Sequence, residues 1–99
     1  MAMQGRISTI EGDADKIDDA IEIINEKILP ALKDLEGFTA ANFLVDRSAG
    51  RLVAVAFYAS EAALEASAEA VAPMRTEVAE AMNGNVVSAE SYELVAQSW

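Results

Sequence analysis

The residue types that most often carry out catalysis at neutral pH are missing from this chain. None of its 99 residues is a histidine or a cysteine. The sequence therefore offers no thiolate nucleophile, no cysteine metal site and no catalytic triad of the usual forms. It also has no glycine-rich phosphate loop. The side chains left as candidates for a site are Tyr58, Asn42 and Arg75, together with several carboxylates.

Tyr58 and Asn42 each have two interpretations. The Tyr58 hydroxyl could position a substrate oxygen or act as a general acid, but a tyrosine that ends a strand is more often a core residue with its hydroxyl at the rim. Asn42 is an amide in the otherwise apolar segment TAANFLV. Burying it unpaired would cost roughly 1 to 3 kcal/mol. We therefore expect Asn42 to bond either to a ligand carbonyl or across a subunit interface.

Arg75 and Met74 follow Pro73 directly and form a second group of candidates. Arg75 could bind an acidic or phenolate group at the mouth of a pocket, and the simpler alternative is a solvated or ion-paired surface arginine. Met74, Val78 and Met82 recur at helical spacing. Methionines in such a pattern either line an adaptable pocket or fill the core, and the core is the more common role.

The acidic clusters do not predict a metal site. The segment DADKIDD resembles the start of a calcium loop, but Ile17 and Asp18 stand where that loop needs an oxygen ligand and a glycine. Glu61, Glu65 and Glu69 repeat every four residues, which is typical of a solvated helix face. We expect no metal.

The first third of the chain reads as a strand followed by a helix. Residues 3–11 predict the strand, and Asp15 is placed to cap the helix. Pro30 should kink or break this helix, because proline lacks a backbone donor and clashes with the preceding turn. Gly37 then ends it. The helix is indicated by apolar residues at steps of three and four: Ile17, Ile21, Ile24, Ile28, Leu32 and Leu35.

The rest of the chain reads as a hairpin, a helical region and a last strand. Residues 38–46 and 51–58 are strand-like runs separated by RSAG, a hairpin signal. Ser60 is placed to cap the next helix. Pro73 should break that helix and start a second short one, which Asn83-Gly84 terminates. Residues 86–96 predict a more polar last strand.

This order of elements predicts a single α+β domain over residues 1–99. It is the ferredoxin-like βαββαβ arrangement, in which the helices cover one face of a four-stranded antiparallel sheet. Right-handed crossovers place the first and third strands in the centre. If Asp46 faces Arg51 across the hairpin, Asn42 pairs with Val55 and Phe43 pairs with Ala54. Asn42 and Tyr58 then lie on opposite faces of the sheet.

The second face of the sheet predicts a homodimer. The run Leu52–Tyr58 has no polar side chain before Tyr58, so both faces of this strand need cover. With Leu52, Ala54, Ala56 and Tyr58 toward the helices, the opposite face would expose a large apolar patch in a monomer. The simplest cover is the same face of a second copy, related by a twofold axis. The predicted dimer face comprises Asn42, Val53, Val55 and Phe57.

Charge and hydropathy exclude several partners. Seventeen acidic residues against seven basic ones give a net charge of −10, which repels nucleic acids and anionic membrane surfaces. No apolar run approaches the roughly 18 residues of a membrane span. The segment MAMQGRISTI has no apolar region typical of a secretory signal. We therefore expect a cytoplasmic protein that binds neither nucleic acid nor membrane.

Several segments of the chain resemble those of a known protein family. The segments LPALKDLEGF, VDRSAGR and FYASEAALEAS, with a tyrosine-bearing last strand, are similar to the dimeric α+β barrel proteins of the antibiotic biosynthesis monooxygenase type. The resemblance covers about residues 6–95. It implies two sheets packed face to face and, in the enzymes, a pocket between sheet and helices where an aromatic substrate reacts with oxygen without metal or flavin.

The resemblance also implies which residues would form the site. Tyr58 stands where many of these enzymes carry a tryptophan, and Ala54 stands where one branch carries an asparagine. Without histidine the haem-binding branch is not expected, and we expect no cofactor. Two hypotheses follow: a cofactor-independent monooxygenase acting on a small aromatic molecule, or a non-catalytic dimeric module that binds a hydrophobic molecule or serves a structural role. The expected ligand-binding residues are Phe43, Ala54, Tyr58, Leu64, Met74 and Arg75, with Tyr58 the best catalytic candidate.

Overall fold

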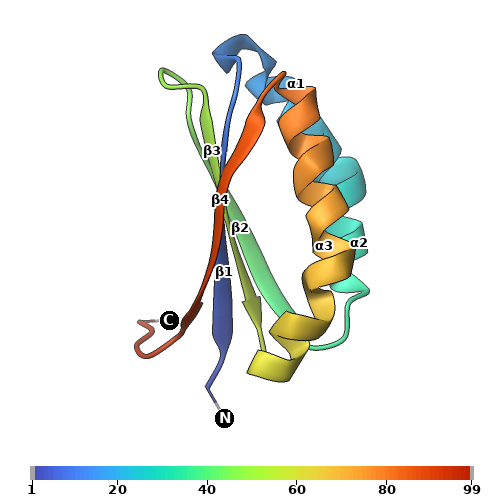
Figure 1. Cartoon of the computed structure of the whole chain (residues 1–99), viewed down its shortest axis with the longest axis vertical. Coiled ribbons are helices and arrows are strands. Elements are labelled where there is room, and N and C mark those ends of the chain that lie inside the picture. The colour runs from blue at the N-terminus through green and yellow to red at the C-terminus, as the bar shows by residue number, and fades with distance from the viewer. Residues whose placement is uncertain (1, 99) are drawn as a thin grey trace.

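Helices cover one face of a four-stranded antiparallel sheet in the computed structural model, which describes residues 2–98 (Figure 1). The strands lie in the order β2-β3-β1-β4, so β1 and β3 are central. The predicted ferredoxin-like fold is confirmed, with the more polar last strand at an edge. The strand bounds are Gln4–Glu11 (β1), Phe38–Asp46 (β2), Arg51–Tyr58 (β3) and Asn85–Glu93 (β4).

The first helical segment is continuous across Pro30. It consists of a 3-10 turn η1 (Ala14–Lys16), α1 (Ile17–Ile23), a π-helical turn η2 (Ile24–Ile28) and α2 (Leu29–Lys33). The backbone N–H of Leu29 donates to the carbonyl of Ile24, five residues back. This wider turn lies directly before Pro30 and accommodates a residue that has no backbone N–H to donate. The expected break therefore does not occur. The expected cap at Asp15 is also wrong, because this residue lies inside η1.

The second helix, α3 (Glu61–Ala81), is also uninterrupted. Ser60 caps it as predicted, since its side chain accepts a hydrogen bond from the backbone N–H of Ala63 at 3.1 Å. The break expected at Pro73 is wrong. The carbonyl that a residue at position 73 would normally bond belongs to Glu69, which lies on the exposed side of the helix where water can bond to it. Asn83 ends the region with a positive φ of 53°.

The hairpin register follows the predicted one. Asp46 faces Arg51, Asn42 faces Val55 and Phe43 faces Ala54. Because side chains alternate along a strand, Ala54 and Tyr58 point toward the helices and Asn42 points away from them. Between the sheet and the helices lies the core, whose buried residues include Ile10, Ile17, Ile24, Ile28, Leu32, Leu52, Val71, Val78 and Met82.

Candidate ligand-binding site

A buried arginine on the central strand β1 is the most unusual feature of the core. Arg6 is only 7% exposed. Its guanidinium donates to the Ser67 hydroxyl at 3.1 Å, to the Leu64 carbonyl at 3.0 Å and, more weakly, to the Tyr58 hydroxyl at 3.4 Å. Its position follows from strand alternation, because Arg6, Ser8 and Ile10 all face the helices.

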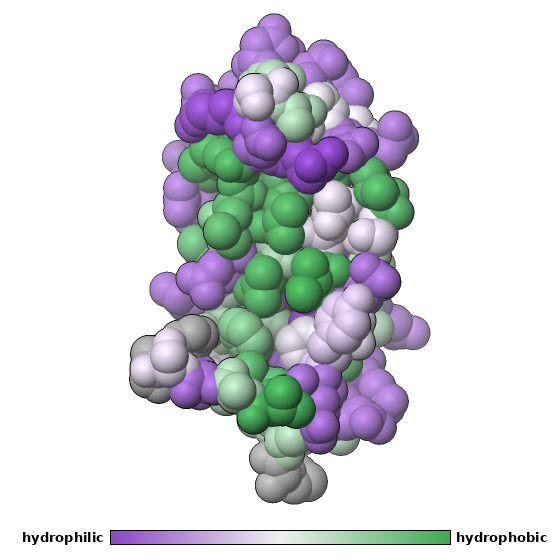
Figure 2. Space-filling view, turned by 90° about the vertical axis from the view of Figure 1, so that its left-hand side faces the viewer, coloured by the Kyte–Doolittle hydropathy of each residue, from purple (hydrophilic) through white to green (hydrophobic). Residues whose placement is uncertain are grey.

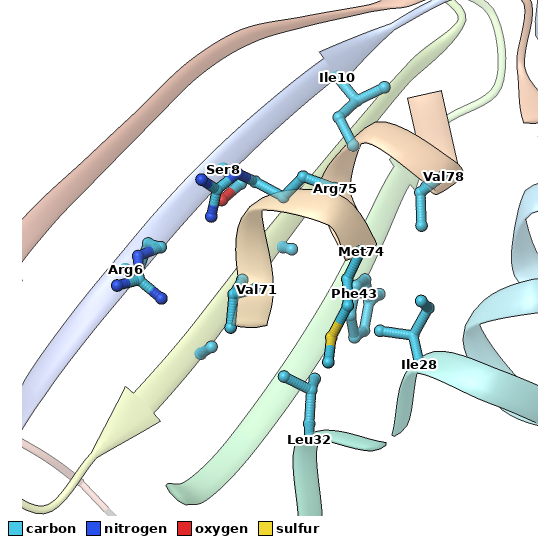
Figure 3. Close-up of a pocket in the computed structure, with 12 residues that line it drawn as sticks. Arg6, Ser8, Ile10, Ile28, Leu32, Phe43, Val71, Met74, Arg75 and Val78 are labelled. Carbon is cyan, nitrogen blue, oxygen red and sulfur yellow. The ribbon is translucent and has the colours of Figure 1, made fainter. Parts of the chain in front are cut away.

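A second arginine reaches the same place from the opposite layer. Figure 3 shows the Arg75 side chain extending from α3 toward β1, the strand that carries Arg6 and Ser8. One terminal nitrogen of Arg75, Nη1, is buried without a hydrogen-bond partner. Burial lowers the pKa of Arg75, and the positive charge of Arg6 lowers this pKa further. Both arginines remain charged at neutral pH, because guanidinium is not deprotonated in proteins.

Neither of these two arginines has an acidic partner among the residues that the structure describes. Within residues 2–98, no carboxylate oxygen lies within 4.0 Å of either guanidinium. The acids and bases that do pair lie at the surface. These ion pairs are Lys27–Glu77 at 2.9 Å, Arg47–Asp18 at 3.0 Å and Arg51–Glu11 at 2.9 Å.

The arginines line a small cavity between the sheet and the helices, called here the arginine cavity. Its volume is about 40 Å³, which accommodates about three water molecules at roughly 10–15 Å³ each. Its walls are apolar apart from the arginines and Ser8. The lining comprises Arg6, Ser8, Ile10, Ile28, Leu32, Phe43, Ala54, Ala56, Val71, Met74, Arg75 and Val78 (Figure 3).

Four of the six residues expected to bind a ligand line this cavity. They are Phe43, Ala54, Met74 and Arg75. The other two do not line the cavity. Tyr58 is fully buried, with its ring edge-on to Phe38 at 5.9 Å between ring centres, and Leu64 is also buried.

Sequence reasoning missed the residue that joins these groups, Arg6. An arginine in phase with Ser8 and Ile10 along an apolar strand was the available signal, since that alternation places it on the buried face. Arg6 links Tyr58 to the arginine cavity through its hydrogen bond and through its guanidinium, which lies 5.4 Å from the centre of the Tyr58 ring.

The face of the sheet opposite the helices is apolar. Figure 2 shows hydrophobic side chains gathered over its middle. Val53, Val55 and Phe57 of the predicted dimer face lie there half-buried, and Asn42 is exposed on the edge strand β2. Strand pairing adds further apolar residues to this face, called here the open face: Ile7, Leu44 at 56% exposure and Tyr92 at 52%.

Two larger hollows lie elsewhere among the described residues, one of about 290 Å³ that includes Asn42 and Phe43 and one of about 340 Å³ that includes Ser60, and no arginine lines either of them. Within residues 2–98, no three acidic side chains gather as they would to hold a metal ion. Over the same range, no helix is both long and apolar enough to cross a membrane. The arginine cavity is therefore the candidate ligand-binding site of this protein.

Fold and cavity together define the class of this protein. It is a ferredoxin-like α+β domain with the fold of the antibiotic biosynthesis monooxygenase-like proteins, with a charged cavity between sheet and helices. The resemblance predicted from the sequence is thus confirmed at the level of the fold.

Solved structures with this fold include enzymes. The monooxygenase ActVA-Orf6 of Streptomyces coelicolor, solved with the ligand nanaomycin D, superposes with a TM-score of 0.68 at 12% identity, over 99% of this chain and 89% of that one. SnoaB of Streptomyces nogalater, a cofactor-independent oxygenase, gives 0.59 at 14% identity over 100% and 97%. NE2512 of Nitrosomonas europaea, of unknown function, gives 0.76 at 18% identity over 100% and 95%.

Comparison by sequence finds similarity to uncharacterised proteins. No family model matches the chain. The uncharacterised protein Rv2557 of Mycobacterium tuberculosis is 34% identical over 91 residues, which are 92% of this chain and 40% of that protein. The chain thus spans less than half the length of this relative.

Proposed function

We propose that this protein binds a small aromatic molecule between its sheet and its helices and acts on it as a cofactor-independent monooxygenase. The observation that carries the proposal is the arginine cavity, an apolar space with two arginines that have no acidic partner within residues 2–98. The fold shared with ActVA-Orf6 and SnoaB supports the same reaction class. Arginines in this position would stabilise a negative charge that develops on a substrate oxygen.

A hydroquinone is the substrate class that fits a site without cofactor. One atom of O₂ enters at a ring carbon, the ring is oxidised to a hydroxyquinone, and the second oxygen atom leaves as water. The ring itself supplies the electrons, so no other reductant is needed. The protein's part is to bind the ring, to hold its ionised oxygen beside the arginines and to exclude water.

An aromatic ring enters this cavity only if side chains move, because 40 Å³ is far below the roughly 300 Å³ of ordinary small-molecule sites. Met74 is the lining residue best suited to move. It is half-buried on α3 and borders Phe43 (Figure 3), and its unbranched side chain changes rotamer easily. Rotation of Met74 would open the cavity between α3 and β2.

Oxygen consumption tests this function. A panel of phenols and hydroquinones is given to the wild-type protein and to Tyr58→Phe, with oxygen followed by electrode and hydroxyquinone by absorbance. We expect uptake with hydroquinones and a slower rate in the variant, because the Tyr58 hydroxyl helps to hold Arg6. Equal rates would remove Tyr58 from the mechanism, and no uptake would contradict the monooxygenase activity.

A non-catalytic binding module is the second candidate, and one observation favours it. Ala54 and Ala56 line the cavity where catalytic groups would project from β3, and the polar residues of the lining are two arginines and a serine. None of these readily accepts a proton from a substrate at neutral pH. Ligand binding without oxygen uptake in the assay above would establish this alternative.

We also infer that the protein is a homodimer that packs its open face against a second copy. Val53, Val55 and Phe57 form the middle of this face, and Leu44 and Tyr92 extend it while staying more than half exposed. A monomer would leave this apolar surface in water. Twofold pairing buries it with one self-complementary interface.

A further inference from the structure

The two arginines of the arginine cavity indicate which chemical group its ligand carries. We propose that Arg6 and Arg75 together bind the carboxylate group of a small molecule whose apolar part lies against Phe43 and Met74. This deepens the function proposed above and rests on it only in placing the ligand between sheet and helices. The choice of a carboxylate follows from the positive charges of Arg6 and Arg75 and from their positions in the cavity.

The arrangement of the two arginines is costly for the folded protein. Two like charges share an apolar cavity, each side chain partly or wholly desolvated, and Arg75 Nη1 has no partner. An uncompensated buried charge is among the most destabilising features a fold can contain. Apolar side chains of the same size would remove this cost. The arrangement is therefore one that a bound anion would complete.

The two arginines differ in how their guanidinium groups are held. Arg6 is held by three neighbours, namely the Leu64 carbonyl and the Ser67 and Tyr58 hydroxyls. Arg75 leaves a buried donor free. The guanidinium of Arg6 is thus held in place before a ligand binds, and Arg75 has a donor available for the ligand. A binding site for an anionic group needs both properties.

A carboxylate is the anionic group that fits these two guanidinium groups best. A carboxylate has two oxygens, matches the planar guanidinium fork and is ionised at neutral pH without help. The cavity volume of about 40 Å³ suits the carboxylate group itself, and the apolar part of the ligand needs the movement of Met74 described above.

Benzoate is the probe that tests this assignment. Binding of sodium benzoate to the full chain is measured by calorimetry and by the shift in melting temperature, with sodium chloride at equal ionic strength and with uncharged benzamide. We expect benzoate to bind and to raise the melting temperature, and benzamide to bind at least tenfold more weakly. Absence of benzoate binding at about 10 mM would overturn the proposal, as would tighter binding of inorganic phosphate.

Arg75→Met is the decisive variant. It should weaken benzoate binding at least tenfold and, at the same time, raise the melting temperature of the ligand-free protein by a few degrees, because it removes an unpaired buried charge. A purely structural arginine would give the opposite shift in melting temperature. Arg75→Met that binds benzoate as the wild type does, or that melts at a lower temperature when ligand-free, would overturn the proposal.

Arg47→Met is the matched control, since it removes the same charge from an exposed arginine paired with Asp18. It should bind benzoate like the wild type, and an equal loss in both variants would show that net charge alone governs binding. Arg75→Lys keeps the charge but not the planar fork, so it should bind benzoate several-fold more weakly than the wild type. Oxygen uptake with hydroquinones is scored separately, so the failure of one proposal is distinguishable from the failure of the other.

Discussion

Arg6 and Tyr58 contact each other in two ways. The guanidinium donates to the tyrosine hydroxyl at 3.4 Å, and its central carbon lies 5.4 Å from the centre of the tyrosine ring. The two residues are neighbours because β1 and β3 pair side by side, with Arg6 opposite Ala56. Tyr58 therefore supports the cavity from outside its wall by holding an arginine that lines it.

Tyr58→Phe should lower the free energy of unfolding by about 1 kcal/mol. The substitution removes one long hydrogen bond from a buried arginine but leaves the ring and the bonds to Ser67 and Leu64. Urea denaturation of the two proteins measures the difference. A loss well above 3 kcal/mol would mean that the hydroxyl has a larger structural role than the 3.4 Å contact indicates.

Met74→Ala should enlarge the arginine cavity. We expect the free energy of unfolding to fall by about 1 to 2 kcal/mol. This is less than for a fully buried methionine, because Met74 is only half-buried. Hydroquinone should then raise the melting temperature more in the variant than in the wild type. Met82→Ala is the control, since this methionine is buried but does not line the cavity. A similar gain in both variants would contradict a specific role for Met74.

Gly50→Ala should destabilise the turn between β2 and β3 by about 1 to 3 kcal/mol. Gly50 has a φ of +65°, and an added Cβ would overlap the carbonyl of Gly12. That overlap falls where the Gly12 N–H donates to the Gly50 carbonyl at 2.9 Å. Ala49→Ser in the same exposed turn should change stability by less than about 0.5 kcal/mol. Thermal unfolding of the two variants checks both expectations.

Asp46 should make the hairpin sensitive to acid. Hydrogen bonds from the Ser48 side chain and from the Ala49 backbone lower the pKa of Asp46 below 3.8. A carboxyl with a depressed folded-state pKa adds stability that is complete above its unfolded-state pKa and is lost as the pH falls through the lower value. The stability difference between wild type and Asp46→Asn should thus shrink below about pH 4. Unfolding measured from pH 6 to pH 2 tests this, and a constant difference would contradict it.

Phe57→Glu should weaken the proposed dimer at least tenfold. Twofold symmetry would place two new charges in the apolar open face, where neither has a partner. Sedimentation should show the wild type as a dimer at micromolar concentration and the variant shifted toward monomer. Ala70→Glu, on the exposed side of α3, adds the same charge and should leave the dimer intact. A monomeric wild type would end the proposal.

Short-range patterns predicted the parts of the fold that depend on neighbouring residues. The hairpin register, the Ser60 cap and the turn at Asn83 were all readable, because each follows from local alternation or from the backbone preference of one residue. The effect of the two prolines was not. A proline within a helix is tolerated when the freed carbonyl reaches water, as at Pro73, or when a π-helical turn precedes it, as at Pro30.

The sequence by itself determined the order of strands and helices, the two apolar faces of β3 and the absence of histidine and cysteine chemistry. Only the tertiary structure decided that Arg6 is buried and that Arg75 points at the same space. These arginines are 69 residues apart, and their encounter depends on how α3 crosses β1. Charge in a sequence is a sum over residues, whereas a binding site depends on which charges the fold removes from water together.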